Sequence, residues 1–357
     1  MTSPIHIPVL LRESVEALKV RPGGRYIDCT VGTGGHALAI IERSLPGGQL
    51  LGIDADPEAI AVTRQRLAEF GEAVQLVNDN FANLESICTR YSFRPVDGIL
   101  LDLGLSTLQL EGESRGFSFQ REAPLDMRAD PSQGLTAGEI VNSYPEAELA
   151  RLLFEYGEER ASRQISRHIV ANRPINSTLH LVGVIEKSFK GKRGRIHPAT
   201  RTFQALRIAV NNELENLQSA LRQAVALLRP ERRLVVISYH SLEDRIVKNF
   251  LRQEEKGCTC PPQLALCICG RQPTLKILTK RVVTPEAFER LTNPRSHSAR
   301  MRVAERVCPG AGEGTPIADQ GSAAKLTSGS IRRNENREIF VEPSPFGRFL
   351  EAALPLS

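Results

Sequence analysis

Residues 26–36, Tyr26-Ile27-Asp28-Cys29-Thr30-Val31-Gly32-Thr33-Gly34-Gly35-His36, decide the fold of this chain. Apolar and β-branched residues come first, and three glycines follow within the positions 32–35. This run predicts a strand that ends in a tight turn, with a helix over residues 37–43 directly beyond it. Glycines let the backbone approach a ligand closely, and the N-terminus of a helix offers unpaired N–H groups. The stretch therefore predicts a nucleotide-type binding site in an α/β fold.

The next predicted strand, residues 49–54, ends in the carboxylate of Asp54. This acid lies about 20 residues after the glycines, where a βαβ unit places a carboxylate against ribose hydroxyls. Residues 57–70 carry apolar side chains at helical spacing and are expected to form the crossover helix. Together these segments predict two parallel strands with a ligand at their carboxyl ends.

Two kinds of ligand suit the glycine turn, because Gly32, Gly34 and Ala37 also satisfy the dinucleotide fingerprint G-x-G-x-x-G/A. Asp28 distinguishes between them. Beside the pyrophosphate of NAD or FAD its carboxylate would make a like-charge contact, which a low local dielectric makes costly. S-adenosylmethionine carries an ammonium and a sulfonium but no phosphate, so acids at Asp28 and Asp54 favour it. We interpret the turn as a site for this methyl donor, with a dinucleotide site and a purely structural turn as the alternatives.

Composition is compatible with a large globular protein: 357 residues with 41% hydrophobic content predict one large domain with an insertion, or two domains. No apolar run reaches the roughly 18 residues of a membrane span, and no signal-like segment opens the chain, so we expect a cytoplasmic protein without membrane contact. Seven cysteines, an odd number, indicate reduced thiols or metal ligation rather than a disulfide framework. The net charge of +5 is a weak indication of an anionic partner.

Two further predicted strands end at the same edge, and each is followed or ended by a candidate site residue. Residues 74–77 are followed by Phe81, which is expected either to cover an adenine face or to belong to the core. Residues 96–102 end in Asp102 and a turn of small residues. Because ligands of open α/β sheets lie beyond the carboxyl ends of the strands, Asp102 is expected where donor and acceptor meet, with a helix cap as the alternative.

A fifth strand, residues 233–238, runs directly into Tyr239 and His240. Both side chains are therefore expected near the acceptor side of the site. His240 suits a general base, although a histidine that holds the loop by hydrogen bonds fits the pattern equally.

Between residues 111 and 229 the alternation of strand and helix stops, and amphipathic helices are expected over 136–144, 145–172 and 198–228. This segment is predicted to be a helical insertion that serves as the substrate domain. Its basic residues between 160 and 207 are opposed within that stretch by a single acid, Glu186. RNA phosphates are the expected partner, with a solvated surface as the alternative. The residues predicted to contact RNA are Lys190, Lys192, Arg193, Arg195 and Arg201.

Four cysteines stand close together in two C-x-C pairs: Cys258, Cys260, Cys267 and Cys269. Zinc accepts four thiolates, but structural sites more often place two or more residues between paired ligands, so reduced cysteines are the default interpretation. Residues 276–281 and 300–306 are expected to be a final hairpin at the sheet edge. The predicted organisation is a sheet domain in two parts, 1–110 and 230–307, interrupted by the insertion 111–229 and followed by a largely disordered tail, 308–357.

Eight motifs in order between residues 5 and 307 together resemble one family: residues 28–36, 102–106, 115–119, 124–128, 203–208, 238–248, 293–295 and 298–300. They are similar to the bacterial 16S ribosomal RNA cytosine 4-amino methyltransferases, known as RsmH or MraW. The resemblance implies a class I S-adenosylmethionine-dependent methyltransferase fold, α/β and Rossmann-like, with an inserted helical domain. It also implies a cytidine target in the decoding region of 16S rRNA, within the small ribosomal subunit. The donor-binding residues that it implies are Gly34, Gly35, His36, Asp54, Phe81, Asp102 and Gln109.

The chemistry of such a target is demanding, because the lone pair of an exocyclic amine of cytosine is delocalised into the ring. An acceptor at the amine must favour a pyramidal nitrogen while the pocket holds it in line with the methyl group. Many DNA amino methyltransferases use an Asp/Asn/Ser-Pro-Pro-aromatic turn, whereas this chain has Asp102-Leu103-Gly104-Leu105. Stacking is therefore expected from Phe117, Phe119 or Tyr239. Asp102, Tyr239 and His240 are the catalytic candidates.

Two other functional classes remain open at this level. One is an NAD-linked oxidoreductase, which Asp28 disfavours. The other is a non-catalytic RNA-binding or ribosome-assembly protein that has kept the fold.

Overall fold

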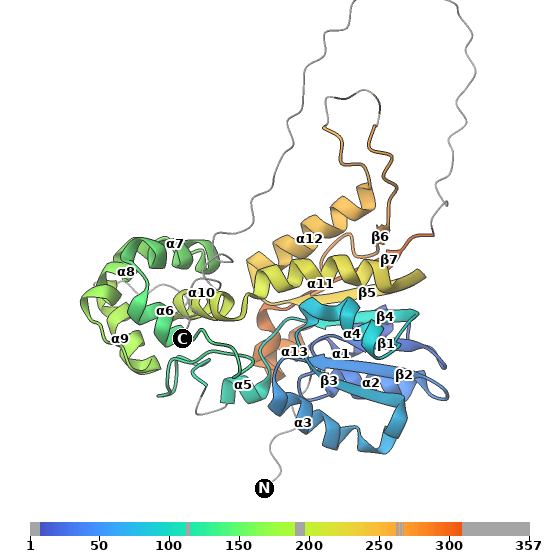
Figure 1. Ribbon diagram of the computed structural model, residues 1–357, viewed down its shortest axis with the longest axis horizontal. Helices are drawn as coiled ribbons and strands as arrows, with labels where there is room; N and C mark the ends of the chain where they lie inside the picture. Colours follow the sequence, from blue (N-terminus) through green and yellow to red (C-terminus); the bar gives the residue numbers. More distant parts are fainter. Residues whose placement is uncertain are drawn as a thin grey trace, which may run out of the picture. The chain divides into compact units, whose positions relative to one another are not determined.

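A computed structural model describes residues 8–111, 115–189, 197–261, 264, 266 and 268–308, and all of these belong to one compact unit. Within this part of the chain the strands form one seven-stranded sheet in the order β3-β2-β1-β4-β5-β7-β6 (Figure 1). The strands are β1 (Arg25–Asp28), β2 (Gln49–Asp54), β3 (Val74–Asn78), β4 (Val96–Asp102), β5 (Leu228–Ser238), β6 (Leu275–Ile277) and β7 (Arg300–Arg306). The predicted Rossmann-like α/β fold is confirmed, including the antiparallel hairpin of β6 and β7 at the edge.

Strands β1 to β5 run parallel, and β7 is antiparallel to both of its neighbours. In the register of β1, Asp28 pairs with Gly52 of β2 on one side and with Leu100 of β4 on the other. Asp54 and Asp102 each stand two residues beyond these partners, at the ends of β2 and β4. The sheet therefore gathers three carboxyls from separate strands at one edge.

Helices cover both faces of the sheet, and Figure 1 shows α11 and α12 on one side and α1, α2 and α3 on the other. The bounds are α1 (Leu11–Leu18), α2 (Gly35–Ser44), α3 (Pro57–Arg66), α4 (Leu84–Arg90), α11 (Glu213–Leu227) and α12 (Ser241–Lys256). Successive residues of a strand point to opposite faces, so Tyr26 joins the core under α1 and α2 while Ile27 joins the core under α4 and α11. Both side chains are buried, as expected for parallel strands covered on both faces.

The helical insertion has a hydrophobic core of its own. Its helices are α5 (Thr107–Glu111), α6 (Ala137–Ser143), α7 (Glu146–Gly157), α8 (Ser162–Ala171), α9 (Thr178–Ser188) and α10 (Ala199–Asn211). The two long helices expected from the apolar spacing are each divided in two, because Glu158 and Asn212 adopt left-handed backbone conformations with φ of 49°. Such a residue ends a helix and redirects the chain.

The C-terminal boundary of the insertion differs from the expected position at residue 229. Helix α11 packs Leu217, Leu221 and Ala224 into the core beneath the sheet, on the same face as α4. It is therefore part of the sheet domain, and the insertion ends near Asn212. The periodicity of residues 198–228 predicted helix correctly but could not reveal which core each half would join.

Two sets of contacts join the insertion to the sheet domain. The Arg115 guanidinium pairs with Asp56 at the end of β2 and donates to the carbonyls of Arg128 and Ala129 at 2.9 and 2.7 Å. On the other side, Glu158 accepts hydrogen bonds from Ser241 and Arg245 at the start of α12. The bond from Arg245 measures 2.6 Å.

The remaining short elements are the 3-10 helices η1 (Ala68–Ala73), η2 (Phe81–Asn83) and η3 (Pro294–Ser298), together with α13 (Ala287–Thr292). Among the described helices, none combines the length and the apolar character needed to cross a bilayer. The predicted tail, residues 308–357, lies outside the described residues apart from Cys308 at its start.

Candidate functional site

A cavity of about 680 Å³ opens at the carboxyl ends of the parallel strands, and residues of the insertion complete its wall. Its size falls within the range of small-molecule and cofactor sites. The predicted site residues that line it are Gly32, Gly35, His36, Asp54, Phe81, Asp102, Gln109, Tyr239 and His240. The fold thus brings side chains from nearly the whole length of the chain into one site.

The glycine turn has the backbone geometry that its sequence predicts. Gly32 and Gly34 have φ of 51° and 81°, a region that other residues adopt only with strain. A Cβ on Gly35 would lie 2.2 Å from Cγ of Pro8, so the first residue of α2 has no room for a side chain. The turn and the start of α2 therefore lie close against the cavity.

Asp54 is half-buried at the end of β2, and two backbone groups orient its carboxylate. Oδ2 accepts the N–H of Gly32 at 2.8 Å, and Oδ1 accepts the N–H of Asp56 at 2.9 Å. Burial raises its pKa to about 6, although these two hydrogen bonds oppose the shift. Each oxygen retains a second lone pair for a ligand hydroxyl.

Asp28 differs from the other two carboxyls, because its side chain is fully buried and does not line the cavity. Oδ1 accepts the N–H of Thr30 at 3.1 Å, whereas Oδ2 has no hydrogen-bond partner among the described residues. Burial, with further contributions from the charges of Asp102 and Asp54, raises its pKa to about 7. Three carboxyls in one region thus make a negative environment, which suits a cation and opposes a phosphate. Direct contact between Asp28 and a donor stays a prediction.

Asp102 lies on the wall of the cavity at the end of β4, held by Tyr239. The Tyr239 hydroxyl donates to Oδ1 at 2.8 Å, and a Cβ on Gly104 would lie 2.7 Å from the Tyr239 ring, so the turn after β4 packs against this ring. Burial raises the pKa of both Asp102 and Tyr239, so the phenol stays protonated as the donor.

His36, at the start of α2, lies beside the same carboxylate. Its Nδ1 is 3.6 Å from Oδ2 of Asp102, beyond hydrogen-bond distance, and its Nε2 lies 3.1 Å from the carbonyl of Val9. Burial lowers its pKa, which makes the neutral imidazole the stable form at neutral pH. With Nε2 as the protonated nitrogen, His36 ties the lead-in segment to the glycine turn.

His240 caps α12. Its side chain accepts the N–H of Glu243 at 3.4 Å, while the Glu243 carboxylate accepts the N–H of Tyr239 at 2.8 Å and of His240 at 3.3 Å. The Nε2 atom lies 3.1 Å from Oε1 of Glu243, but the angle between the two groups is not that of a hydrogen bond. This geometry supports the loop-holding interpretation of His240. A catalytic role stays a prediction.

Glu213, His240 and Glu243 offer ligand atoms within 4.8 Å of one another, the spacing of a cation site. However, Nη2 of Arg207 donates to Glu213 at 2.9 Å, and Glu243 already accepts two backbone N–H groups. Arg207 therefore neutralises Glu213, and the backbone N–H groups occupy one oxygen of Glu243. We therefore assign no metal to this group.

Aromatic rings form part of the cavity wall. Phe119 stacks on His197 with ring centroids 4.9 Å apart and meets Phe203 edge-on at 5.7 Å. Phe117 is almost completely buried in the core of the insertion and also borders the cavity. Phe81 is half-buried: it packs against the core of the sheet domain and also lines the cavity. Its position is therefore compatible both with a place in the core and with the predicted contact to an adenine face.

Gln109 lies on α5, and its side-chain oxygen accepts the N–H of Ser106 at 3.0 Å, while the Ser106 hydroxyl accepts the N–H of Gln109 at 3.2 Å. This reciprocal pair orders the turn that follows β4. Gln109 also borders the cavity, which is compatible with the predicted contact with the donor. That contact stays a prediction.

Several basic residues of the insertion lie beside acids that are not near them in the sequence. Arg201 lies 3.9 Å from Glu159, Arg207 pairs with Glu213, and Arg167 lies 3.8 Å from Glu146. These acids stand outside the stretch 160–207, so only the fold reveals the pairing. The remaining predicted RNA contacts, Lys190, Lys192, Arg193 and Arg195, lie outside the described residues.

Three residues of the cavity wall had no role in the sequence interpretation. Glu243 follows His240 at the spacing of a capping box, which is a detectable signal. Asn211 holds the loop 127–129 by accepting the N–H of Ala129 at 2.7 Å and donating to the carbonyl of Met127 at 2.8 Å. Arg295 reaches the cavity from η3. No local pattern marks Asn211, because Met127 and Ala129 are distant from it in sequence, whereas Arg295 belongs to the motif 293–295.

The comparison with known proteins is consistent with this geometry. Residues 3–307 match the MraW methylase family. The chain is 60% identical to the "Ribosomal RNA small subunit methyltransferase H" of Dehalococcoides mccartyi strain 195 over 313 residues, which are 87% of this chain and 90% of that protein. It is 52% identical to the protein of the same name from Thermomicrobium roseum over 308 residues, 85% of this chain and 94% of that one.

Solved structures are more distant. An rRNA methylase from Streptococcus thermophilus is 12% identical with a TM-score of 0.38, covering 86% of this chain and 99% of that chain, and a similarity at this level carries no further conclusion. The family match and the identities confirm the resemblance derived from the eight sequence motifs. The chain belongs to the MraW methylase family.

Proposed function

We propose that this protein transfers a methyl group from S-adenosylmethionine to the exocyclic 4-amino group of a cytidine in the decoding region of 16S rRNA. One observation carries the proposal: the Gly32–Gly35 turn, the oriented Asp54 carboxylate, and Asp102 with Tyr239 all border one cavity. The family match and the names of the two relatives support the same activity. An oxidoreductase, the third class considered from the sequence, does not fit this family or the acidic character of the site.

The residues around the glycine turn fit the methyl donor. Asp54 has lone pairs at the correct strand end for a vicinal diol, and its two backbone hydrogen bonds hold the carboxylate before any ligand arrives. Burial raises the pKa of Asp28 and Asp102, and a bound sulfonium and ammonium nearby would favour the ionised form of both carboxyls. Bound S-adenosylmethionine would supply an electrophilic methyl group. The protein contributes the orientation and the electrostatic environment.

At the acceptor side, Asp102 is the proposed catalytic residue. An amine N–H that donates to its carboxylate gains electron density at nitrogen and moves toward a pyramidal geometry. The Tyr239 hydroxyl already occupies one lone pair of Oδ1, so Tyr239 positions the carboxylate rather than acting on the base itself. After transfer, the nitrogen carries one proton too many, and Asp102 can accept it because burial raises its pKa.

A cytosine within folded RNA can reach this cavity only when its base is unstacked. Phe119, whose ring is held against His197 and Phe203, provides a rigid apolar surface for such a base. Base–aromatic stacking contributes roughly 1–3 kcal/mol per base, which offsets part of the cost of unstacking. The basic residues 190–195 and Arg201 are proposed to contact the phosphates around the target. We place the reaction on small ribosomal subunits in the cytoplasm.

The decisive experiment uses small subunits from a strain that lacks this protein. Purified protein and labelled S-adenosylmethionine are added, and the rRNA is digested and analysed for 4-N-methylcytidine by mass spectrometry. We expect one labelled cytidine, in the decoding region, and none with the Asp102→Ala variant. Label on another base, or on another part of the RNA, would overturn the proposed target.

The non-catalytic alternative makes a different prediction for the same preparation. An assembly protein would bind the subunit without incorporating label, even with saturating donor. A thermal-shift comparison adds a direct test of the ligand, because a donor that binds only the folded state raises the melting temperature. We expect S-adenosylmethionine to raise it and NAD to leave it unchanged.

A further inference from the structure

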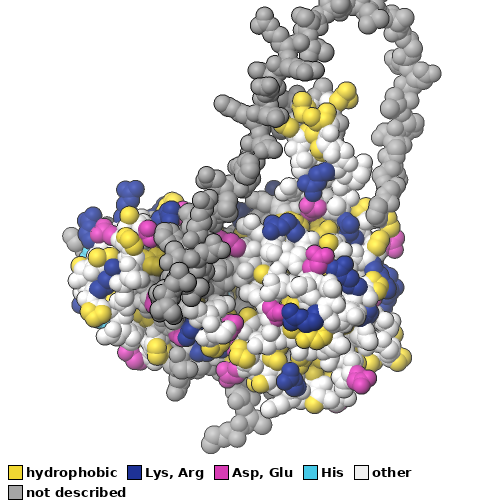
Figure 2. Space-filling view, in the orientation of Figure 1, with side chains coloured by type: hydrophobic (Ala, Val, Ile, Leu, Met, Phe, Trp, Pro, Cys, Tyr) yellow, Lys and Arg dark blue, Asp and Glu magenta, His cyan; other side chains and the backbone are white. Residues whose placement is uncertain are grey.

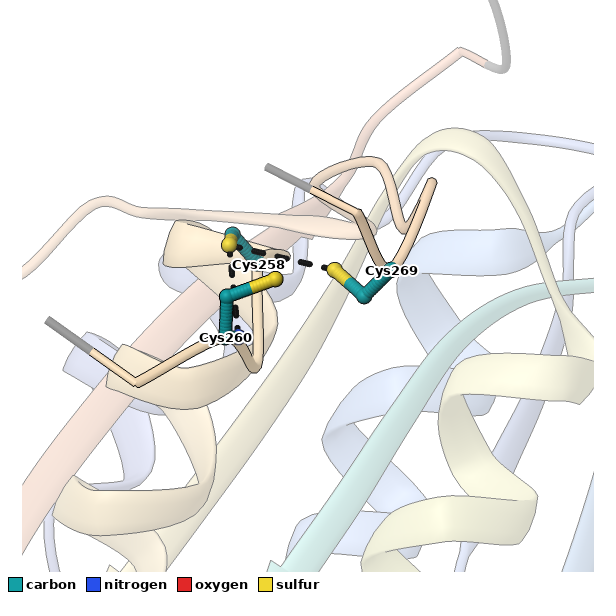
Figure 3. A group of neighbouring side chains, drawn as sticks. All are labelled: Cys258, Cys260 and Cys269. Atoms are coloured by element: carbon teal, nitrogen blue, oxygen red, sulfur yellow. Dashed lines mark hydrogen bonds between the residues drawn. The ribbon is translucent and has the colours of Figure 1, made fainter. Parts of the chain in front are cut away.

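The loop after α12 contains three described cysteines that lie close together, and none of the three lines the cavity. This loop connects the end of α12 at Lys256 with the start of β6 at Leu275. Figure 3 shows Cys258, Cys260 and Cys269 with their sulfurs turned toward one another. All three Sγ atoms lie within 4.8 Å of one another.

The sulfur spacing is that of ligands around one tetrahedral ion. Sγ of Cys258 and Sγ of Cys269 are 3.8 Å apart. Zinc–thiolate bonds of about 2.3 Å at tetrahedral angles require sulfurs about 3.8 Å apart, whereas a disulfide requires about 2.05 Å. The C-x-C spacing, which made zinc the less favoured interpretation of the sequence, therefore does not prevent the sulfurs from converging.

Backbone N–H groups are also directed at the sulfurs. The N–H of Cys260 lies 3.4 Å from Sγ of Cys258, and the N–H of Ile268 lies 3.4 Å from Sγ of Cys260. Such donors stabilise negative charge on thiolates and are typical of the groups that surround metal ligands. They also orient the two sulfurs before an ion binds.

The large apolar side chains that the structure describes in this loop are exposed and contribute little burial to hold it in place. Figure 2 shows hydrophobic side chains gathered on the surface beyond α12, and Leu266 and Ile268 are each 80% exposed. Where the loop returns to the helix, Gly257 lies so close to the backbone of Gln272 and Pro273 that a Cβ would approach within 2.5 Å. A segment whose described apolar side chains are this exposed is the kind that a structural metal stabilises.

We propose that Cys258, Cys260 and Cys269 bind one structural zinc ion, which fixes this loop at the C-terminal end of α12. A single ion is favoured over an iron–sulfur cluster, because all three sulfurs fall within the span of one tetrahedron. Binding displaces the thiol protons, so zinc affinity increases with pH. Cys267 lies outside the described residues.

The test begins with the full chain, produced with zinc and purified without a metal-binding tag. We expect about one zinc per chain by elemental mass spectrometry. Cys258→Ser and Cys269→Ser should each reduce zinc retained against a chelator at least tenfold, while Cys308→Ser, a matched cysteine outside the cluster, should retain it. Iron in place of zinc, or equal zinc in all variants, would overturn the proposal.

A second measurement uses the unmodified chain and does not depend on whether the variants fold. The thiols are alkylated with and without prior chelation, and each cysteine is quantified by peptide mapping. We expect zinc to protect Cys258, Cys260 and Cys269 and the chelator to remove this protection, with Cys308 modified equally in both samples. Equal modification of the three cysteines in both samples would contradict the site.

Discussion

Asp28 allows a quantitative test of how the site is built. Its carboxyl is fully buried, one oxygen has no hydrogen-bond partner among the described residues, and burial raises its pKa from 3.8 to about 7. The folded protein therefore keeps this proton up to about pH 7, whereas the unfolded chain releases it near pH 4. Between these values the folded state binds more protons, so this residue makes stability fall as pH rises.

The size of the effect follows from the same pKa values. Each pH unit between 3.8 and about 7 corresponds to about 1.4 kcal/mol, so ionising Asp28 in the folded state costs up to about 4 kcal/mol. Asparagine has the same shape and can still accept the N–H of Thr30, but it does not titrate in this range. Asp28→Asn should therefore gain stability over the parent as pH rises from 4 to 8, by an amount approaching that figure.

Urea unfolding followed by far-ultraviolet circular dichroism suits this measurement, because the chain contains no tryptophan. The free energies of unfolding of parent and variant are compared at several pH values without donor. Asp126→Asn is the control of opposite sign: although burial raises the pKa of Asp126, hydrogen bonds from Arg128 outweigh it and hold that pKa below its ordinary value. Asp126 thus adds stability above pH 4 that is lost on acidification, and its replacement should destabilise most near neutrality.

Parallel stability curves for the parent and Asp28→Asn would refute the reasoning, because they would show that Asp28 ionises as readily in the folded state as in the unfolded chain. With donor present, the cation should favour the ionised carboxyl. The parent should then prefer S-adenosylmethionine over S-adenosylhomocysteine more strongly at pH 8 than at pH 6, and the variant should lose this dependence.

Three further predictions concern binding and turnover. Asp54→Ala should weaken donor binding by roughly 1.5–3 kcal/mol through loss of a charge-assisted acceptor, and unchanged affinity by calorimetry in a folded variant would remove Asp54 from the site. Asp102→Ala should lower turnover far more than donor affinity, whereas an equal loss of both would make it a donor ligand only. Neutralising the four bases between residues 190 and 195 should flatten the salt dependence of RNA affinity by about 0.7–0.9 in log–log slope per lost phosphate contact, with donor affinity as the control. An unchanged slope would leave that segment without a role in RNA binding.

The sequence by itself determined the sheet and the position of its site. Runs of apolar and β-branched residues located β1 to β5, and acids at the strand ends were predictable because parallel strands deliver their carboxyl ends to one edge. Asp54, Asp102 and Tyr239 were therefore expected at this edge from their positions in the sequence, and all three line the cavity. The family resemblance was readable for the same reason, since its motifs lie at these strand ends and turns.

Only the tertiary structure decided which partners these side chains have. Helix α11 packs against the sheet domain and Arg201 lies beside Glu159 through contacts between residues that are distant in sequence. Periodicity records which face of a helix is apolar, but not which core that face will meet. Net charge along a segment likewise records no pairing with acids elsewhere. The sulfur geometry of the C-x-C pairs has the same origin, because the distance between Cys258 and Cys269 depends on the path of the loop in space.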